Sequence, residues 1–186
     1  KLFLEPVGRN TAPALTMAAM LAEQDGKDPV LVVTPSDQII RDTDGFITAL
    51  NNCIKAANEE SIVIMGITPD KAETGYGYIK HDLKAGKFNE FNVEQFIEKP
   101  TLEKAEQYVQ SKDYLWNGGI FVVKASIWLN TIKSLRLDIF EATLNNLKKN
   151  IKDNQFIRPD KENFSKIPSE SIDYAVIEKC NAAGIP

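Results

Sequence analysis

Histidine and cysteine are scarce in this 186-residue sequence, which contains one histidine, His81, and two cysteines, Cys53 and Cys180. The cysteines lie far apart and lack CxxC spacing, so a zinc site with histidine and thiolate ligands cannot be assembled. Cys53 falls on the apolar side of a helical pattern. We therefore expect it to be a buried free thiol.

The sequence also has no long apolar run, and its acidic residues outnumber its basic ones. Asp and Glu number 26 against 22 Lys and Arg, giving a net charge of -4 and a pI of about 5.2. This balance argues against broad binding to nucleic acid or to a membrane surface, but a small anionic ligand needs only a local positive field. No membrane-spanning run and no signal peptide are visible, so we expect a cytoplasmic protein.

Several motifs of common enzyme classes are missing. The sequence has no GxGxxG and no GxxxxGK[ST], which excludes the dinucleotide-binding fingerprint and the P-loop. It has no GxSxG elbow, and its one histidine has no evident partner for a Ser-His-Asp hydrolase. Catalysis by paired carboxylates stays open. The available lysine, arginine and aspartate residues fit phosphate chemistry better.

The sequence does contain the alternation of strands and helices that is typical of an α/β domain. Residues 30–33 and 61–67 are apolar runs of the kind buried in parallel sheets, and helical patterns cover residues 14–23 and begin again at Thr43. Right-handed crossovers then predict a mixed, mainly parallel sheet flanked by helices. We expect one domain over residues 1–186, truncated at both ends. Later strands are expected at residues 93–97 and 120–123. Later helices are expected from residue 101 and at residues 126–135, 139–151 and 171–179. A hairpin-like excursion is expected over residues 81–92.

The stretch Glu5 to Ala14 joins a short apolar strand to the first helix. A strand, a tight turn and a helix start together aim backbone N–H groups at an anion or a polar ring. In this stretch Gly8 permits the turn, Arg9 offers a cation, and Asn10 and Thr11 offer donors or a helix cap. A well-capped turn without a ligand explains the same residues.

Polar residues also follow the later strands, at the sheet edge where α/β proteins bind ligands. Asp37 comes directly after residues 30–33 and is the best candidate for an Mg²⁺ ligand, although it can equally cap the following turn. Gly75 and Gly77 either let a ligand approach the backbone or mark a β-bulge.

Two further groups stand at predicted strand ends. Glu98 and Lys99 place a hydrogen-bond acceptor and a cation side by side. The carboxylate can bind sugar hydroxyls and the ammonium a phosphate, or the two can form a simple surface ion pair. Asn117 offers a side-chain amide to a ligand, and Gly118 and Gly119 offer unhindered backbone. A turn without a ligand explains the same three residues.

Taken in order, seven motifs resemble the mannose-1-phosphate guanylyltransferases, also called GDP-mannose pyrophosphorylases. The resemblance is to the bacterial type, often fused to a mannose-6-phosphate isomerase domain, and it covers nearly the whole chain. The motifs are EPVGRNTAPAL, VVTPSDQII, TGYGYIK, FIEKP, WNGGIF, FIRPDKENF and SIDYAVIEK.

The resemblance implies a Rossmann-like nucleotidyltransferase domain that joins mannose 1-phosphate to GTP with Mg²⁺, releasing pyrophosphate. It implies that Asp37 binds Mg²⁺ and that Lys99 orients the attacking phosphate, these two being the expected catalytic residues. The expected guanine pocket comprises Glu5, Gly8, Arg9, Asn10 and Thr11, and the expected mannose 1-phosphate site comprises Gly77, Glu98, Lys99, Asn117, Gly119 and Asp173. For Asp173, capping of its own helix is an equal explanation.

The sequence also departs from the family pattern. Gln38 stands where a histidine is common, and Gly118 where a serine is common. A glycine-rich loop carrying Thr-Arg-Leu and a following lysine, and a Gly-Trp-Ser-Asp-Val-Gly segment whose Asp completes the metal site, are not among these residues. We therefore expect this 186-residue chain alone to bind ligands weakly and turn over little or nothing. Robust GDP-mannose synthesis by the purified chain would overturn that expectation.

Two other functions stay open at this stage. One is nucleotide transfer to a different sugar 1-phosphate or from a different nucleotide, since the scaffold is shared. The other is a non-catalytic module that binds sugar nucleotides. The sequence also leaves open a homodimer, a following isomerase domain and the polysaccharide pathway that uses the product.

Overall fold

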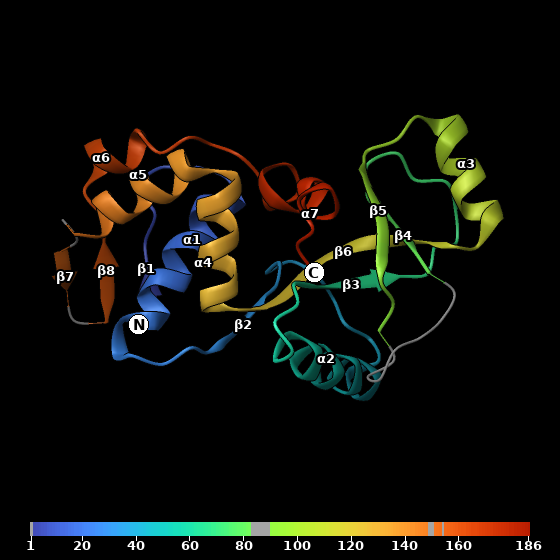
Figure 1. Cartoon of the computed structure of the whole chain (residues 1–186), viewed down its shortest axis with the longest axis horizontal. Coiled ribbons are helices and arrows are strands. Elements are labelled where there is room, and N and C mark those ends of the chain that lie inside the picture. The colour runs from blue at the N-terminus through green and yellow to red at the C-terminus, as the bar shows by residue number, and fades with distance from the viewer. Residues whose placement is uncertain (1, 83–89, 149–150, 154) are drawn as a thin grey trace. The chain divides into compact units, whose positions relative to one another are not determined.

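A computed structural model of the chain describes residues 2–82, 90–148, 151–153 and 155–186 (Figure 1). The chain forms two compact units, one from Lys1–Pro29 with Ala125–Lys179 and one from Val30–Lys124 with Cys180–Pro186. Most of the predicted excursion over 81–92 lies outside the described residues. The prediction of a single domain stays a prediction.

The first unit is mainly helical. Its short sheet pairs β1 (Leu2–Phe3) in parallel with β8 (Phe156–Arg158), which pairs antiparallel with β7 (Ile151–Asp153). In Figure 1, α1 lies beside α4 and α5. The helical elements are α1 (Thr11–Ala22), η1 (Glu23–Asp25), α4 (Ala125–Leu135), α5 (Leu137–Leu147), α6 (Lys161–Ser165) and the π-helical turn η2 (Asp173–Ile177).

Large apolar side chains from α1, α4 and α5 form the core of this unit. Met17, Trp128, Ile132 and Ile139 are all at most 1% exposed. The one polar group of the Trp128 ring is satisfied inside this core, since its Nε1 donates to Thr16 Oγ1 over 3.1 Å. A buried indole N–H needs such a partner, so this hydrogen bond fixes how α1 and α4 pack.

The second unit is built on a five-stranded sheet with β6 at its centre. The register places β3 on one side of β6, with β2 and β4 on the other side, and β5 outside β4. The strands are β2 (Val30–Val33), β3 (Val63–Ile67), β4 (Gly77–His81), β5 (Val93–Glu98) and β6 (Tyr114–Lys124).

Of the described helices, α2 (Thr43–Ala57) and α3 (Leu102–Ser111) contact this sheet. In α2, Asp42 caps the first turn by accepting from the Gly45 N–H over 2.9 Å. Ala105 of α3 is fully buried in a cluster with Tyr78 and Trp116. The last helix, α7 (Glu178–Ala183), closes the chain. Within the described ranges, the helices are all too short or too polar to cross a membrane.

The predicted α/β class, with a mixed sheet flanked by helices, is confirmed. The prediction that the sheet is mainly parallel is wrong, because among the described strand pairs β1 with β8 is parallel and the others are antiparallel. The reason is β6, which lies between the like-directed strands β2 and β3 and runs the other way. This strand begins at Tyr114, six residues before the predicted start. The short elements β7, β8 and α6 were not predicted.

Candidate functional site

The start of α1 in the first unit is capped by protein groups. Asn10 adopts a left-handed backbone with φ of 66°, and its Oδ1 accepts from the Thr11 N–H over 2.9 Å. The Ala12 N–H donates to the Glu170 carbonyl over 3.1 Å. Pro13 has no N–H to offer. The structure therefore shows a capped helix start with its first amides occupied. Ligand binding by this turn stays a prediction.

The same turn is tied to the segment that contains Asp173. Thr11 Oγ1 accepts from the Ile172 N–H over 2.9 Å, so the residue before Asp173 is anchored to the first residue of α1. Asp173 opens the π-helical turn η2, a kind of turn that is common at functional sites. Ser171 contributes to the same turn, because its Oγ accepts from the Tyr174 N–H over 3.4 Å. The role of Asp173 stays a prediction.

Two charged side chains of the opening turn, those of Arg9 and Glu5, are partly shielded from solvent. Nε of the half-buried Arg9 is shielded from solvent and has no hydrogen-bond partner in the part of the chain that the structure describes. Glu5 is exposed, yet neighbouring atoms desolvate its carboxyl enough to raise the pKa above the usual value. A buried donor without a partner is costly, so Arg9 offers a ligand acceptor a favourable position.

In the second unit, Asp37 lies in the loop that joins β2 to α2. Its side chain is exposed. The described residues contain no group of three or more acidic, histidine or cysteine side chains placed to hold a metal. Mg²⁺ in nucleotide enzymes takes one or two carboxylates and fills its remaining positions with phosphate oxygens and water. A single exposed carboxylate at a strand end fits that set of donors.

The next residue, Gln38, joins this loop to β6. Its Nε2 donates to the Gly118 carbonyl over 2.8 Å, across 80 residues of sequence. No role for Gln38 follows from its place in the sequence. No local pattern indicates its partner.

The Asn117 to Gly119 segment is an irregular part of β6 and not a separate turn. Asn117 Oδ1 accepts from the Gly119 N–H over 2.9 Å. A Cβ added at Gly118 would lie 2.7 Å from the Met65 carbonyl oxygen, which explains why a side chain is not accommodated there. Gly119 has φ of 69°, a conformation that glycine adopts at little cost.

Gly77, Glu98 and Asn117 meet on one face of the sheet. Gly77 of β4 lies opposite Glu98 of β5. A Cβ added at Gly77 would lie 2.6 Å from Glu98 Oε2, 2.9 Å from Phe96 Cζ and 3.3 Å from Asn117 Cβ. The missing side chain at Gly77 therefore makes room for the Glu98 carboxylate. It does not mark a bulge, since the register between Gly77 and Lys80 is regular.

Lys99 follows at the end of β5 in a strained backbone conformation. Its φ is 49°, and its N–H donates to the Tyr76 carbonyl over 3.2 Å. Its Nζ lies 2.9 Å from Glu98 Oε1, with the Glu98 side chain 9% exposed and the Lys99 side chain 57% exposed. Left-handed backbone at a residue other than glycine costs free energy and concentrates at functional sites.

The structure thus sorts the predicted residues into two groups. Asp37, Gly77, Glu98, Lys99, Asn117 and Gly119 belong to the second unit. Glu5, Gly8, Arg9, Asn10, Thr11 and Asp173 belong to the first. Asp173 therefore shares its unit with the opening turn, whereas the other residues expected for the sugar phosphate share theirs with Asp37.

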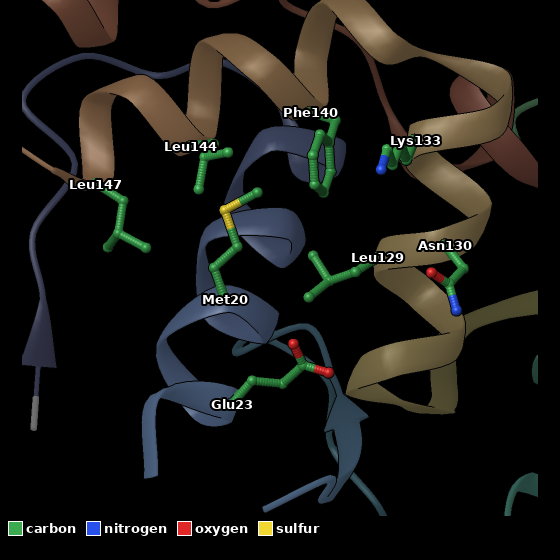
Figure 2. A pocket seen from close by; sticks show the side chains of 8 residues that line it. All are labelled: Met20, Glu23, Leu129, Asn130, Lys133, Phe140, Leu144 and Leu147. Carbon is green, nitrogen blue, oxygen red and sulfur yellow. The ribbon is translucent and has the colours of Figure 1, made fainter. Parts of the chain in front are cut away.

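A hollow of about 330 Å³ in the first unit contains none of these residues (Figure 2). It lies among α1, α4 and α5, and Lys133 Nζ stands 5.6 Å from the centre of the Phe140 ring at its edge. Its lining is Met20, Glu23, Leu129, Asn130, Lys133, Phe140, Leu144 and Leu147.

Comparisons with known proteins show which sequences and folds this chain is similar to. Residues 1–163 match the family model described as nucleotidyl transferase. A mannose-1-phosphate guanylyltransferase of Salmonella muenchen is 45% identical over 179 residues, which is 95% of this chain and 38% of that protein. The xanthan biosynthesis protein XanB of Xanthomonas campestris is 43% identical over 178 residues, 96% of this chain and 38% of that protein. The chain spans about 38% of the length of these relatives.

Two solved structures are also similar. A crystal structure titled mannose-6-phosphate isomerase, from Helicobacter pylori, superposes with a TM-score of 0.86 at 28% identity, covering 95% of this chain and 68% of that one. A structure titled mannose-1-phosphate geranyltransferase, from Thermus thermophilus, superposes with a TM-score of 0.81 at 32% identity, covering 95% of this chain and 49% of that one.

Proposed function

Because the chain belongs to the nucleotidyl transferase family, we propose that the protein containing it transfers GMP from GTP to mannose 1-phosphate. The products are GDP-mannose and pyrophosphate. The observation that carries the proposal is the Glu98–Lys99 pair, a largely buried carboxylate held 2.9 Å from an exposed ammonium at a strand end. The names of the guanylyltransferase relatives support the choice of substrates.

The second unit would hold the sugar phosphate. Glu98 accepts hydrogen bonds from sugar hydroxyls, and the exposed Lys99 ammonium meets the phosphate. Asn117 and Gly119 add an amide and open backbone. Gly77 contributes by leaving space for the Glu98 carboxylate. Small-molecule substrates also suit a chain of net charge -4 better than nucleic acid does.

Asp37 would hold Mg²⁺ together with phosphate oxygens. When bound, the ion offsets the negative charge of the triphosphate. Asp37→Asn should raise the Mg²⁺ concentration needed for half-maximal activity, whereas Asp44→Asn, an exposed change in the first turn of α2, should not.

The first unit would read the base. The Glu5 carboxylate accepts from guanine N1–H and N2–H₂, and adenine cannot satisfy both of those contacts. Arg9 supplies a donor that the described residues leave unpaired. Gly8, Asn10 and Thr11 shape the turn. The hydrogen bond from the Ile172 N–H to Thr11 anchors the residue before Asp173 to this turn.

In the reaction, a phosphate oxygen of mannose 1-phosphate attacks the α-phosphorus of GTP in line, and pyrophosphate leaves with the electron pair of the broken P–O bond. Lys99 orients the attacking phosphate. The protein's main contribution is positioning and charge stabilisation, as in other phosphoryl transfers.

A substrate panel tests the proposal. Pyrophosphate release should be measured for the complete protein with GTP, ATP or UTP, each paired with several sugar 1-phosphates. GTP with mannose 1-phosphate should give the highest kcat/KM. Preference for another pair would replace the proposed substrates, and tight GDP-mannose binding without turnover would favour a non-catalytic module.

A further inference from the structure

The side chain of Gln38 connects two parts of the proposed site that lie far apart in the sequence. It donates to the Gly118 carbonyl over 2.8 Å. Asp37 precedes the donor residue Gln38 in the sequence. Asn117 and Gly119 precede and follow the acceptor residue Gly118. A single side chain thus links the loop with the proposed metal carboxylate to the strand with the proposed sugar phosphate residues.

The backbone around this hydrogen bond depends on two glycines. A side chain at Gly118 would run into the Met65 carbonyl oxygen, 2.7 Å from the added Cβ. A Cβ at Gly119 would lie 3.4 Å from Pro35 Cγ and 4.0 Å from Gln38 Nε2. The loop from Pro35 to Gln38 therefore packs against the glycine pair, and the amide of Gln38 fixes the separation.

The loop that contains Gln38 is irregular and mostly exposed. Residues 34–42 between β2 and α2 contain no helix or strand, and Asp37 and Gln38 are both exposed. A part-buried hydrogen bond of this kind contributes only modestly to the stability of the whole fold, because its groups bond to water in the unfolded chain. Locally, the same bond decides where the loop sits relative to β6.

We propose that Gln38 is a positioning residue that holds Asp37 in register with the Asn117–Gly119 segment, so that metal-bound phosphate and sugar phosphate meet correctly. This inference rests on the proposed function. Gln38 acts through the Gly118 carbonyl and touches no reacting atom.

Three variants of the complete protein test the role. Gln38→Glu keeps the shape but replaces the donor with an acceptor, which the Gly118 carbonyl repels. Gln38→His restores a ring N–H at a similar distance from the backbone. Gln107→Glu on α3 is the matched control, since it makes the same change at an exposed position of the same unit.

The measurements are the Kd for mannose 1-phosphate by calorimetry, kcat and KM, hydrogen exchange of the amides of residues 36–41, and the melting temperature. Gln38→Glu should raise the Kd about tenfold and speed exchange in the loop, with a melting temperature within about 2 °C of wild type. Gln38→His should recover most of the affinity. Gln107→Glu should match wild type.

Unchanged binding and exchange in Gln38→Glu would overturn the inference. So would a large fall in melting temperature with all kinetic constants changed alike, because that pattern marks a purely structural residue. If the wild-type protein makes no GDP-mannose, the proposed function fails by that result alone. Hydrogen exchange of residues 36–41 would still decide whether Gln38 holds the loop, since it needs neither turnover nor a bound sugar phosphate.

Discussion

The carboxylate of Glu98 fills the space that a side chain at position 77 would enter. Glu98 Oε2 lies 2.6 Å from the position of a Cβ built on Gly77, well inside van der Waals contact. Glu98 Oε1 in turn lies 2.9 Å from Lys99 Nζ. A glycine on one strand thus sets the position of an ion pair on the next.

Gly77→Ala should therefore displace the Glu98 carboxylate and weaken mannose 1-phosphate binding. We expect the KM for the sugar phosphate to rise about tenfold, with a destabilisation of about 1–3 kcal/mol from the crowding. Gly75→Ala is the control, because its added Cβ would lie 3.4 Å from Glu73 Oε1, an ordinary contact. A wild-type KM in Gly77→Ala would show that Glu98 does not bind the sugar.

Lys99→Met should remove the cation that we propose to orient the attacking phosphate. We expect kcat to fall about 100-fold or more, as when other charge-stabilising groups are lost. Lys112→Met is matched in backbone as well as in charge, because Lys112 also has positive φ, 64° against 49° for Lys99. Steady-state kinetics of the two variants should differ sharply. An equal loss in both would point to general charge effects.

Thr16→Val should destabilise the first unit by about 1–3 kcal/mol, since it leaves the buried Trp128 N–H without its acceptor. Urea unfolding measures the change through the free energy of unfolding. Thr16→Ser keeps the hydroxyl that accepts from Trp128 and donates to the Ala12 carbonyl, so it should cost less. If Thr16→Ser is the more damaging change, packing of the methyl group outweighs the hydrogen bond.

Burial raises the pKa of the Cys180 thiol to about 11. The reactive form is the thiolate, so alkylation of Cys180 at pH 8 in the native protein should be about 100-fold slower than in the unfolded chain. Burial also raises the pKa of the half-buried Cys53, which should react faster than Cys180. Mass spectrometry after timed labelling gives both rates. Equal rates in native and unfolded protein would contradict the burial of Cys180.

The same pKa shift predicts a pH dependence of stability. A thiol whose pKa is higher in the folded state contributes stability below its unfolded pKa, near 8.5, and loses it as the pH rises toward 11. The free energy of unfolding should therefore fall over this range less steeply in Cys180→Ala than in wild type. If the free energy of unfolding falls equally steeply with pH in both proteins, the pKa of Cys180 is not raised by folding.

The sequence predicts the elements well where the apolar pattern is continuous. Val30–Val33 is a strand over the predicted residues. The strand β6 was predicted to begin at residue 120, because Asn-Gly-Gly has the composition of a turn. In the structure those residues lie within the strand, held by the Asn117–Gly119 hydrogen bond and the close approach of Met65. An apolar run does not encode its direction, so the antiparallel course of β6 was not predictable.

The candidate site was predictable only in part. Strand ends carry Asp37, Glu98 and Lys99, and local composition identifies them. What each glycine makes room for depends on contacts across the sheet, as the Gly77–Glu98 relationship demonstrates. Gln38 carries no local signal, because its partner lies 80 residues away.

The proposed guanylyl transfer can be followed directly by ³¹P NMR of the complete protein. With GTP, mannose 1-phosphate and Mg²⁺, we expect the resonances of GDP-mannose and pyrophosphate to grow in equal amounts as both substrates disappear. Release of GDP and inorganic phosphate, or unchanged substrates at saturating enzyme, would contradict it.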